Sequence, residues 1–201
     1  MLIVDCEQRG EQWFNERLGK PSASNFKKIL SPTGKKSEQR TKYMYELVDN
    51  LITGKTREKY QSAAMKEGSD REEESRTLYE LMYGVSVLQV GLVYPDERKQ
   101  YLCSPDGLIL EHEKGLEMKN VDPEMQIETL LANKMPTIHI PQVQGSMFIT
   151  GYKTWDFLSY CPGYKPFIVE IKRDDDYITK LEAELNSFNE ELLQIVERLK
   201  Q

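Results

Sequence analysis

Two carboxylates and a lysine in the middle of the sequence have types and a spacing that suit phosphate chemistry. Asp106 lies in a Pro-Asp-Gly turn at 105–107, and Glu117, Met118 and Lys119 follow eleven residues later on a predicted strand. Because side chains alternate across a strand, Glu117 and Lys119 share one face and Met118 points into the core. Asp106, on the preceding hairpin partner, can approach Glu117 across the pair.

Oxygen ligands of this kind suit a hard divalent cation such as Mg²⁺. Asp106, Glu117 and the Met118 carbonyl can hold one ion and help to hold a second, as in an in-line phosphoryl displacement. Lys119 can orient or deprotonate the attacking water, and a carboxylate from 72–74 can complete the site. The alternative is an ordinary polar turn at Asp106 beside the exposed face of an edge strand.

The elements that must position these residues follow from apolar periodicity and turn chemistry. Helices are predicted over 12–18, from Ser22 or Ser24 as N-cap to Leu30, and over 43–52, 62–83, 123–134, 141–150 and 174–201. Strands are predicted over 85–94, 101–103, 108–110, 116–121, 155–160 and 167–171. Helices outside a central mixed sheet give an α/β (α+β) layer fold. The 3-4-3-4 apolar pattern of the last helix predicts packing on its own domain or on a partner.

Length and composition narrow the class of protein. The 201 residues, 39% of them hydrophobic, suit one domain with a real core. No apolar run approaches the ~20 residues of a membrane span, and the first residues lack the basic start of a signal peptide. The 3 cysteines have no CxxC spacing, which argues against disulfides and a zinc site. We therefore expect a cytoplasmic protein that makes no membrane contact.

The net charge of −6 is unevenly spread along the chain. Positions 17–66 hold 12 Lys and Arg against 4 Asp and Glu, and the remaining positions hold 15 against 29. A chain with one basic segment can present a positive surface to a polyanion while its other faces stay acidic. The alternative is that the lysine-rich helices are simply solvated.

At these residues the sequence resembles the PD-(D/E)xK nuclease superfamily, and more closely the lambda-exonuclease/YqaJ family of phage recombination exonucleases. The similar blocks are Trp13–Gly19 with Ser22–Ser24, then Gly68, Glu72 and Ser75–Glu80, then Cys103–Leu108, Gly115–Lys119 and Gln142–Met147. The resemblance implies a restriction-endonuclease-like core, with a central mixed β-sheet flanked by helices and a long C-terminal helix. Within one nuclease domain, 1–201, it implies a basic DNA-contacting part (1–66), a catalytic core (67–172) and the C-terminal helix (173–201).

The resemblance implies a processive, Mg²⁺-dependent 5′-to-3′ exodeoxyribonuclease that acts on double-stranded DNA ends. Such an enzyme releases 5′-mononucleotides and leaves 3′ single strands for single-strand-annealing recombination. The resemblance further implies two Mg²⁺ ions, for which Mn²⁺ can substitute, and a ring-shaped homotrimer whose channel the basic segment lines. The implied partner is a phage single-strand annealing protein in the cytoplasm of a bacterial host.

The same resemblance assigns roles to individual residues. It implies metal binding by Asp106, Glu117, the Met118 carbonyl and Glu72, water activation by Lys119 and water positioning by Gln142. It implies a 5′-phosphate pocket of Arg17, Ser24 and Ser104. A second pocket arginine, expected shortly after Lys119, is missing from 120–124. His139 stands near the glutamine without an assigned role.

Two other functions stay open at this point. A structure- or sequence-specific endonuclease fits the same core, although no recognition helix rich in Arg and Asn is evident. A non-catalytic DNA-binding or assembly protein is disfavoured because Glu72, Asp106, Glu117 and Lys119 occur together.

Overall fold

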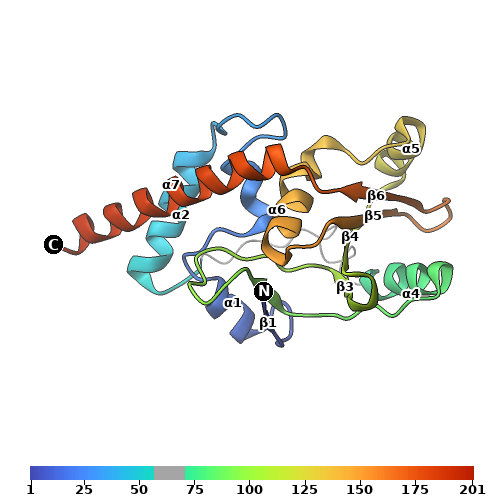
Figure 1. Cartoon of the computed structure of the whole chain (residues 1–201), viewed down its shortest axis with the longest axis horizontal. Coiled ribbons are helices and arrows are strands. Elements are labelled where there is room, and N and C mark those ends of the chain that lie inside the picture. The colour runs from blue at the N-terminus through green and yellow to red at the C-terminus, as the bar shows by residue number, and fades with distance from the viewer. Residues whose placement is uncertain (57–70) are drawn as a thin grey trace.

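The computed structural model describes residues 1–56 and 71–201. Positions 62–70 of the helix expected over 62–83, and the basic residues at 57–66, lie outside the described residues. The elements run in the order β1 (Leu2–Val4), α1 (Glu11–Arg17), the 3₁₀ helix η1 (Ala23–Lys28), α2 (Arg40–Thr53), α4 (Glu72–Tyr83), β2 (Leu92–Tyr94), β3 (Gly107–Ile109), η2 (Leu110–His112), β4 (Lys114–Asn120), α5 (Pro123–Ala132), η3 (Thr137–His139), α6 (Ile140–Thr150), β5 (Thr154–Tyr160), β6 (Phe167–Lys172) and α7 (Asp175–Lys200) (Figure 1).

A four-stranded mixed sheet forms the centre of the fold, in the order β3-β4-β5-β6. Strands β4 and β5 are parallel, and the other two pairs are antiparallel. The parallel pair needs a long crossover connection, which α5 and α6 provide. This arrangement confirms the predicted fold class, a mixed sheet with flanking helices and a long C-terminal helix.

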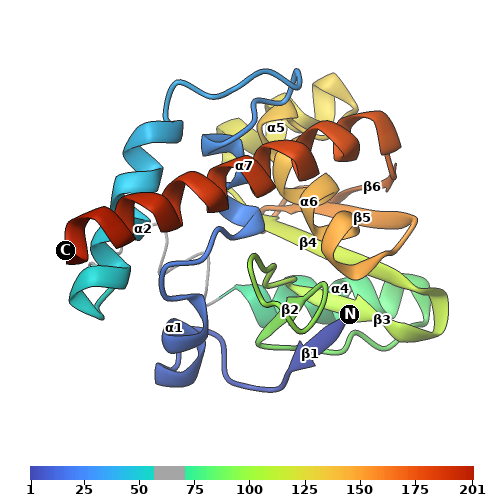
Figure 2. The ribbon, with the colours of Figure 1, turned by 60° about the vertical axis from the view of Figure 1, so that its left-hand side comes forward.

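Helices cover both faces of this sheet. Helices α6 and α7 lie on one face and α4 on the other (Figure 2). Trp155 and Phe157 of β5 pack in the larger core cluster with α6 and α7, whereas Leu116 and Met118 of β4 pack against Tyr79 of α4. Because strand residues alternate, β4 buries Met118 toward α4 and turns its odd-numbered residues toward the α6 side.

The apolar seam of α7 packs on its own chain. Leu181, Leu185 and Phe188 are fully buried, and α7 contacts α2 and α6. Arg40 of α2 binds both carboxylate oxygens of Glu191, at 2.7 and 2.8 Å. The last apolar position, Leu199, is 63% exposed, so the contact with the rest of the chain ends before the helix does.

Two strands differ from the prediction because their partners are distant in the sequence. The segment expected over 85–94 is a strand only over Leu92–Tyr94, where it pairs with the N-terminal residues Leu2–Val4. The segment 101–103 makes only isolated bridges, from Leu102 to Ser22 and from Cys103 to Val93.

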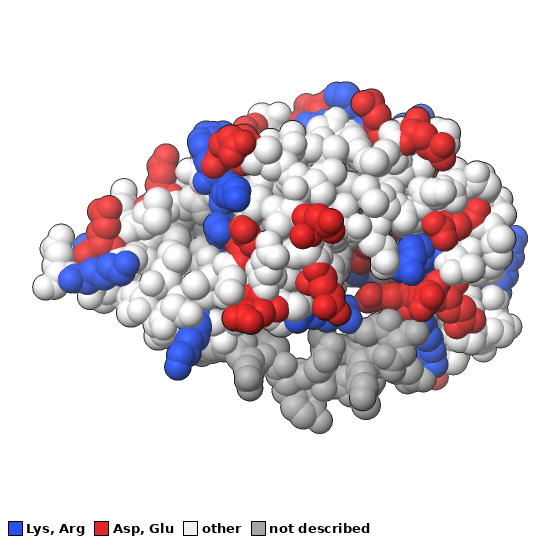
Figure 3. Space-filling model, turned by 90° about the horizontal axis from the view of Figure 1, so that it is seen from below, with Lys and Arg blue, Asp and Glu red and all other residues white. Residues whose placement is uncertain are grey.

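The surface of the described residues carries both signs of charge. Figure 3 shows acidic and basic side chains mixed over one face, with acidic side chains gathered around a hollow near its middle. Lys36 and Arg40, from the basic segment 17–66, pair with Glu184 of α7. No helix among the described residues is both long and apolar enough to cross a membrane.

Candidate active site

The hairpin of β3 and β4 brings Asp106 beside Glu117. Its register pairs Gly107 with Leu116, which places the preceding residue, Asp106, next to Glu117. The Asp106 side chain is fixed there because its Oδ2 atom accepts a hydrogen bond from the Met118 backbone N at 2.6 Å. The proximity expected from strand alternation is therefore present.

The Glu117 carboxylate is buried and poorly satisfied. Its side chain is 1% exposed, and its Oε1 atom lies 2.5 Å from Lys119 Nζ. Among the described residues, neither carboxylate oxygen accepts a hydrogen bond of good geometry. A buried charge with one partner is costly unless further cations or donors compensate, so this carboxylate fits a divalent cation.

Charges within the cluster shift the pKa values of its members. Burial and the charge of Glu117 raise the pKa of Asp106 to about 8, although Lys119 and the Met118 N–H act in the opposite direction. Burial alone would lower the pKa of Lys119, but the carboxylates of Glu117 and Asp106 outweigh it and raise that pKa. Lys119 is therefore protonated near neutral pH and acts as a hydrogen-bond donor, not as a base, whereas Asp106 holds a proton there until a cation displaces it.

Glu72 lies at the edge of this cluster. It is the first residue of α4, and its charge adds to the rise in the pKa values of Asp106 and Lys119. Its Oε1 atom pairs with Arg9 Nη2 at 2.8 Å. In the part of the chain that the structure describes, no three His, Cys, Asp or Glu side chains gather closely enough to hold a metal ion. The expected metal-binding residues are thus only partly brought together: Asp106 and Glu117 are neighbours, whereas Glu72 is paired with Arg9.

Helix α6 places Gln142 near the sheet. The helix packs against β4, and the partly buried Gln142 side chain makes no hydrogen bond to the described residues. Gln144 has a different role, because its Nε2 donates to the Lys172 carbonyl and its Oε1 accepts from Asp174 N, both at 2.9 Å. Gln144 therefore joins the end of β6 to the start of α7.

His139 packs beside the acidic cluster as a neutral aromatic group. Its ring centroid lies 5.3 Å from that of Phe157, and Phe157 is the β5 partner of Glu117 in the sheet. Burial, with the charges of Lys119 and Lys27, lowers the pKa of His139 to about 4. The imidazole is therefore uncharged at neutral pH.

The three residues expected to bind a 5′-phosphate lie together. Arg17 donates to Ser104 Oγ at 3.1 Å and to Ser22 Oγ at 3.0 Å, and Ser22 Oγ lies 3.3 Å from Ser24 Oγ. Ser22 was expected as a possible helix cap, but its hydroxyl makes no capping bond. Ser22 does occupy the expected N-cap position of η1, but its hydroxyl accepts a hydrogen bond from the Arg17 guanidinium instead of from the helix.

Trp13 completes this pocket and had no assigned role. Its ring stacks against Arg17, with Arg17 Cζ 4.0 Å from the ring centroid, and its Nε1 donates to Ser104 Oγ at 2.9 Å. The signal was available in the sequence, because residues four apart share one face of a helix.

The Arg17 guanidinium is suited to an anion. Burial lowers the pKa of Arg17, and within residues 1–56 and 71–201 no carboxylate pairs with it. A buried guanidinium bound only to hydroxyls and a ring fits a phosphate group. Ser104 and Asp106 lie two residues apart in one turn, so this pocket adjoins the acidic cluster.

Comparisons with known proteins identify the family and the fold of the chain. Residues 12–153 match the model of the YqaJ-like viral recombinase domain. The structure is similar to the crystal structure of an alkaline exonuclease, LHK-Exo from Laribacter hongkongensis, with a TM-score of 0.87 and 33% sequence identity over 95% of this chain and 96% of that chain. LHK-Exo in complex with dAMP matches with a TM-score of 0.86, with the same 33% identity over 95% and 96% of the two chains.

A phage related exonuclease from Haemophilus somnus 129PT shares the fold, with a TM-score of 0.68 and 14% identity over 90% of this chain and 96% of that chain. No match was found among curated proteins. The family match spans more than half of the sequence and contains both the acidic cluster and the Arg17 pocket. The chain therefore belongs to the YqaJ-like viral recombinase family, whose fold here is that of the lambda-exonuclease type.

Proposed function

We propose that this protein is a Mg²⁺-dependent exodeoxyribonuclease that digests double-stranded DNA ends in the 5′-to-3′ direction. Membership of the family supports the coarser statement, a nuclease that takes part in recombination. The specific exonuclease activity is supported by the turn at 104–107, because this turn contributes to both the Arg17 pocket and the acidic cluster. Ser104 of this turn accepts a hydrogen bond from Arg17, whose guanidinium pairs with no carboxylate among the described residues. Asp106 of the same turn belongs to the acidic cluster.

The residues of the cluster suit a divalent cation. Asp106, Glu117 and the Met118 carbonyl would hold Mg²⁺, or Mn²⁺ in its place, with Glu72 contributing from the edge. Two bound ions would supply Lewis-acid stabilisation of the charge that develops on phosphodiester oxygens. The orphaned oxygens of Glu117 support this assignment, because a cation would satisfy them.

The side chains around the cluster have separate tasks in this proposal. Protonated Lys119 donates a hydrogen bond to the attacking water or to a phosphate oxygen. Gln142, whose side chain makes no hydrogen bond to the described residues, positions that water. His139 contributes a neutral aromatic wall, because its lowered pKa keeps it uncharged.

The direction of digestion follows from the place of the phosphate pocket. A 5′-phosphate bound by Arg17, Ser22, Ser24 and Ser104 would fix one DNA end beside the acidic cluster. The phosphodiester bond that reaches the cluster would then be the one next to the 5′ end. Each cycle would release a 5′-mononucleotide and leave the complementary strand as a 3′ single strand. The related enzyme LHK-Exo has been seen with dAMP, a molecule of the product class.

The same proposal includes an assembly. A homotrimeric ring, with part of 1–66 lining its channel, would keep the enzyme on DNA through nonspecific phosphate contacts. The segment 67–172 would then be the catalytic core and 173–201 the C-terminal helix. The expected partner, in the cytoplasm of a bacterial host, is a phage single-strand annealing protein that receives the 3′ strand.

Digestion of end-labelled DNA tests this function. Linear 5′-phosphorylated duplex and covalently closed circles are incubated with the protein in Mg²⁺, in Mn²⁺ and with a chelator. We expect mononucleotide release from the linear duplex in either cation, none with chelator, and intact circles. Cutting of closed circles would indicate an endonuclease, and no turnover in either cation would indicate a non-catalytic DNA-binding protein.

A further inference from the structure

Arg9 brings a positive charge to the edge of the acidic cluster, which consists of Asp106, Glu117 and Glu72. Its Nη2 atom lies 2.8 Å from Glu72 Oε1, although 63 positions separate the two residues. The Arg9 and Glu72 side chains are 46% and 38% exposed. The guanidinium therefore holds Glu72 and still faces solvent, where a ligand of the cluster would arrive.

The segment that carries Arg9 is fixed to the turn that carries Asp106. The neighbouring Gln8 donates from Nε2 to the Pro105 carbonyl at 3.0 Å and to the Val90 carbonyl at 2.8 Å. Arg9 itself has a φ of 68°, in the left-handed region that favours glycine. An arginine kept in that conformation, on a segment tied to the cluster, indicates a role for its side chain.

The charge of the cluster indicates what that role is. At full ionisation the three carboxylates outnumber Lys119, the cation that the described residues place among them, so the cluster alone repels phosphate. Bound divalent cation offsets that excess, and a guanidinium at the rim adds the positive charge that a polyanion needs on approach. Arginine suits this position because its planar fork can engage two oxygen acceptors at once.

We propose that Arg9 binds a backbone phosphate of the DNA at the edge of the acidic cluster, while its ion pair with Glu72 keeps the guanidinium in place. The inference rests on the exonuclease function proposed above. Arg9 is a substrate-binding residue in this account, distinct from the Arg17 pocket, because it contacts Glu72 at the start of α4 whereas Arg17 contacts Ser104.

The test measures binding of a short 5′-phosphorylated duplex to the full chain by fluorescence anisotropy, in EDTA and again in Ca²⁺, so that no turnover is needed. Arg9→Gly removes the guanidinium without a backbone cost, because glycine adopts a φ of 68° freely. We expect roughly tenfold weaker binding, and a slope of log K against log salt reduced by about 0.9, the value for one phosphate contact. Wild-type affinity and slope in this variant would overturn the proposal.

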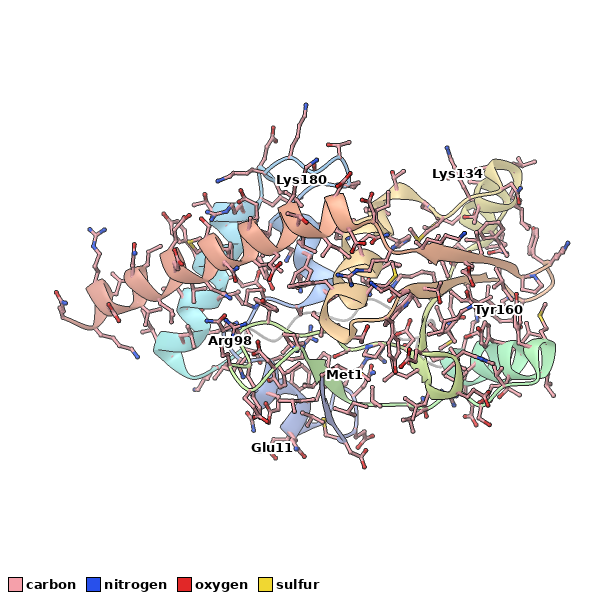
Figure 4. The ribbon with its side chains drawn as sticks, viewed as in Figure 1. Met1, Glu11, Arg98, Lys134, Tyr160 and Lys180 are labelled. Atoms are coloured by element: carbon pink, nitrogen blue, oxygen red, sulfur yellow. The ribbon has the colours of Figure 1, made fainter. Side chains whose placement is uncertain are left out.

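Two further variants keep the result interpretable. Arg9→Gln keeps much of the side-chain length without the charge and must show the same loss. Arg98→Ala is the matched control, because Arg98 (labelled in Figure 4) forms a similar exposed ion pair with Asp96 at 2.6 Å. It is expected to leave affinity and slope unchanged, and a loss as large as that of Arg9→Gly would overturn the specific assignment.

A double variant separates a direct contact from an effect through Glu72. In the Glu72→Gln background, Arg9→Gly must still weaken DNA binding, because a phosphate contact does not need the carboxylate. If the loss disappears in that background, Arg9 acts only by placing Glu72 and the proposal is wrong. Wild-type protein that fails to bind duplex in both conditions would refute the exonuclease function itself, whereas binding that Arg9→Gly leaves unaltered refutes the Arg9 contact alone.

Discussion

The raised pKa of Asp106 predicts that cation binding is linked to proton release. Burial and Glu117 raise that pKa to about 8, and a carboxylate must be deprotonated to bind a metal ion. Below pH 8, each lower pH unit should therefore weaken the apparent affinity for Mg²⁺ or Mn²⁺ about tenfold. Between pH 8, where half of Asp106 is already protonated, and pH 6 the loss should be roughly fiftyfold, or about 2.3 kcal/mol.

The sign of the stability effect follows from the same shift. Without cation, the folded chain holds a proton on Asp106 that the unfolded chain loses near its ordinary pKa of 3.8. The stability contributed by this group is therefore complete below about pH 4 and falls as pH rises to about 8. Added cation should oppose that fall, because it binds the ionised carboxylates of the folded state.

Isothermal titration calorimetry with Mn²⁺ tests this linkage. Titrations at pH 6, 7 and 8, in two buffers of different ionisation enthalpy, give both the affinity and the number of protons released. We expect release of about 0.9 proton at pH 7, and Asp106→Asn should lose both the release and most of the affinity. Equal affinity at pH 6 and pH 8 without proton release would refute the reasoning about Asp106.

Three further predictions concern the phosphate pocket and the helices around the site. Arg17→Ala should lower the rate on 5′-phosphorylated ends roughly tenfold to a hundredfold, because it loses a charge-assisted hydrogen bond of about 1.5–3 kcal/mol. The rate on 5′-hydroxyl ends should fall much less, and an equal loss on both kinds of end in a gel assay would show that Arg17 contacts the DNA elsewhere. Gln144→Ala should lower the free energy of unfolding by about 1 kcal/mol, because it removes two hydrogen bonds to partly buried backbone groups. Gln142→Ala should instead lower turnover with little change in the melting temperature, and reversed effects in melting and digestion assays would exchange their roles. Gly145→Ala should destabilise the fold by about 1–3 kcal/mol, because an added Cβ would lie 2.4 Å from Phe26 Cδ2; a denaturant midpoint unchanged from wild type would show that the ring has room to move.

Local patterns in the sequence predict the hairpin of the candidate site well. A tight turn at 105–107 and strict alternation at 117–119 leave one register in which Met118 is buried, and the structure has that register. The helix of 174–201 is equally well marked, because its apolar residues repeat at helical spacing and it packs against α2. In both cases short-range periodicity determines which side chains face the core.

The remaining features depend on contacts between distant parts of the chain. Leu2–Val4 forms a strand only because Leu92–Tyr94 lies beside it, and three apolar residues alone give no such signal. The ion pair of Arg9 with Glu72 likewise has no short-range pattern. Ser22 has the sequence context of a helix cap, yet its hydroxyl accepts a hydrogen bond from Arg17. Tertiary contacts override local preference at that residue.

A further polar contact shows how α4 is fixed to the sheet. Tyr160, at the end of β5 (Figure 4), donates its hydroxyl to Glu74 Oε1 at 2.5 Å. The bond to Glu74, together with burial, raises the pKa of Tyr160 to about 12, so the phenol stays protonated at neutral and alkaline pH. This contact helps to hold the start of α4, where Glu72 lies, against the edge of the sheet.

Release of mononucleotides by active-site variants tests the central claim most directly. Wild type, Asp106→Asn and Glu117→Gln, each shown to be folded by thermal melting, are incubated in Mg²⁺ with duplex that carries a 5′-terminal label. We predict that wild type releases the label as a mononucleotide and that both variants release almost none. Full turnover by both variants would show that the cluster of Asp106 and Glu117 is not where the phosphodiester bond is cut.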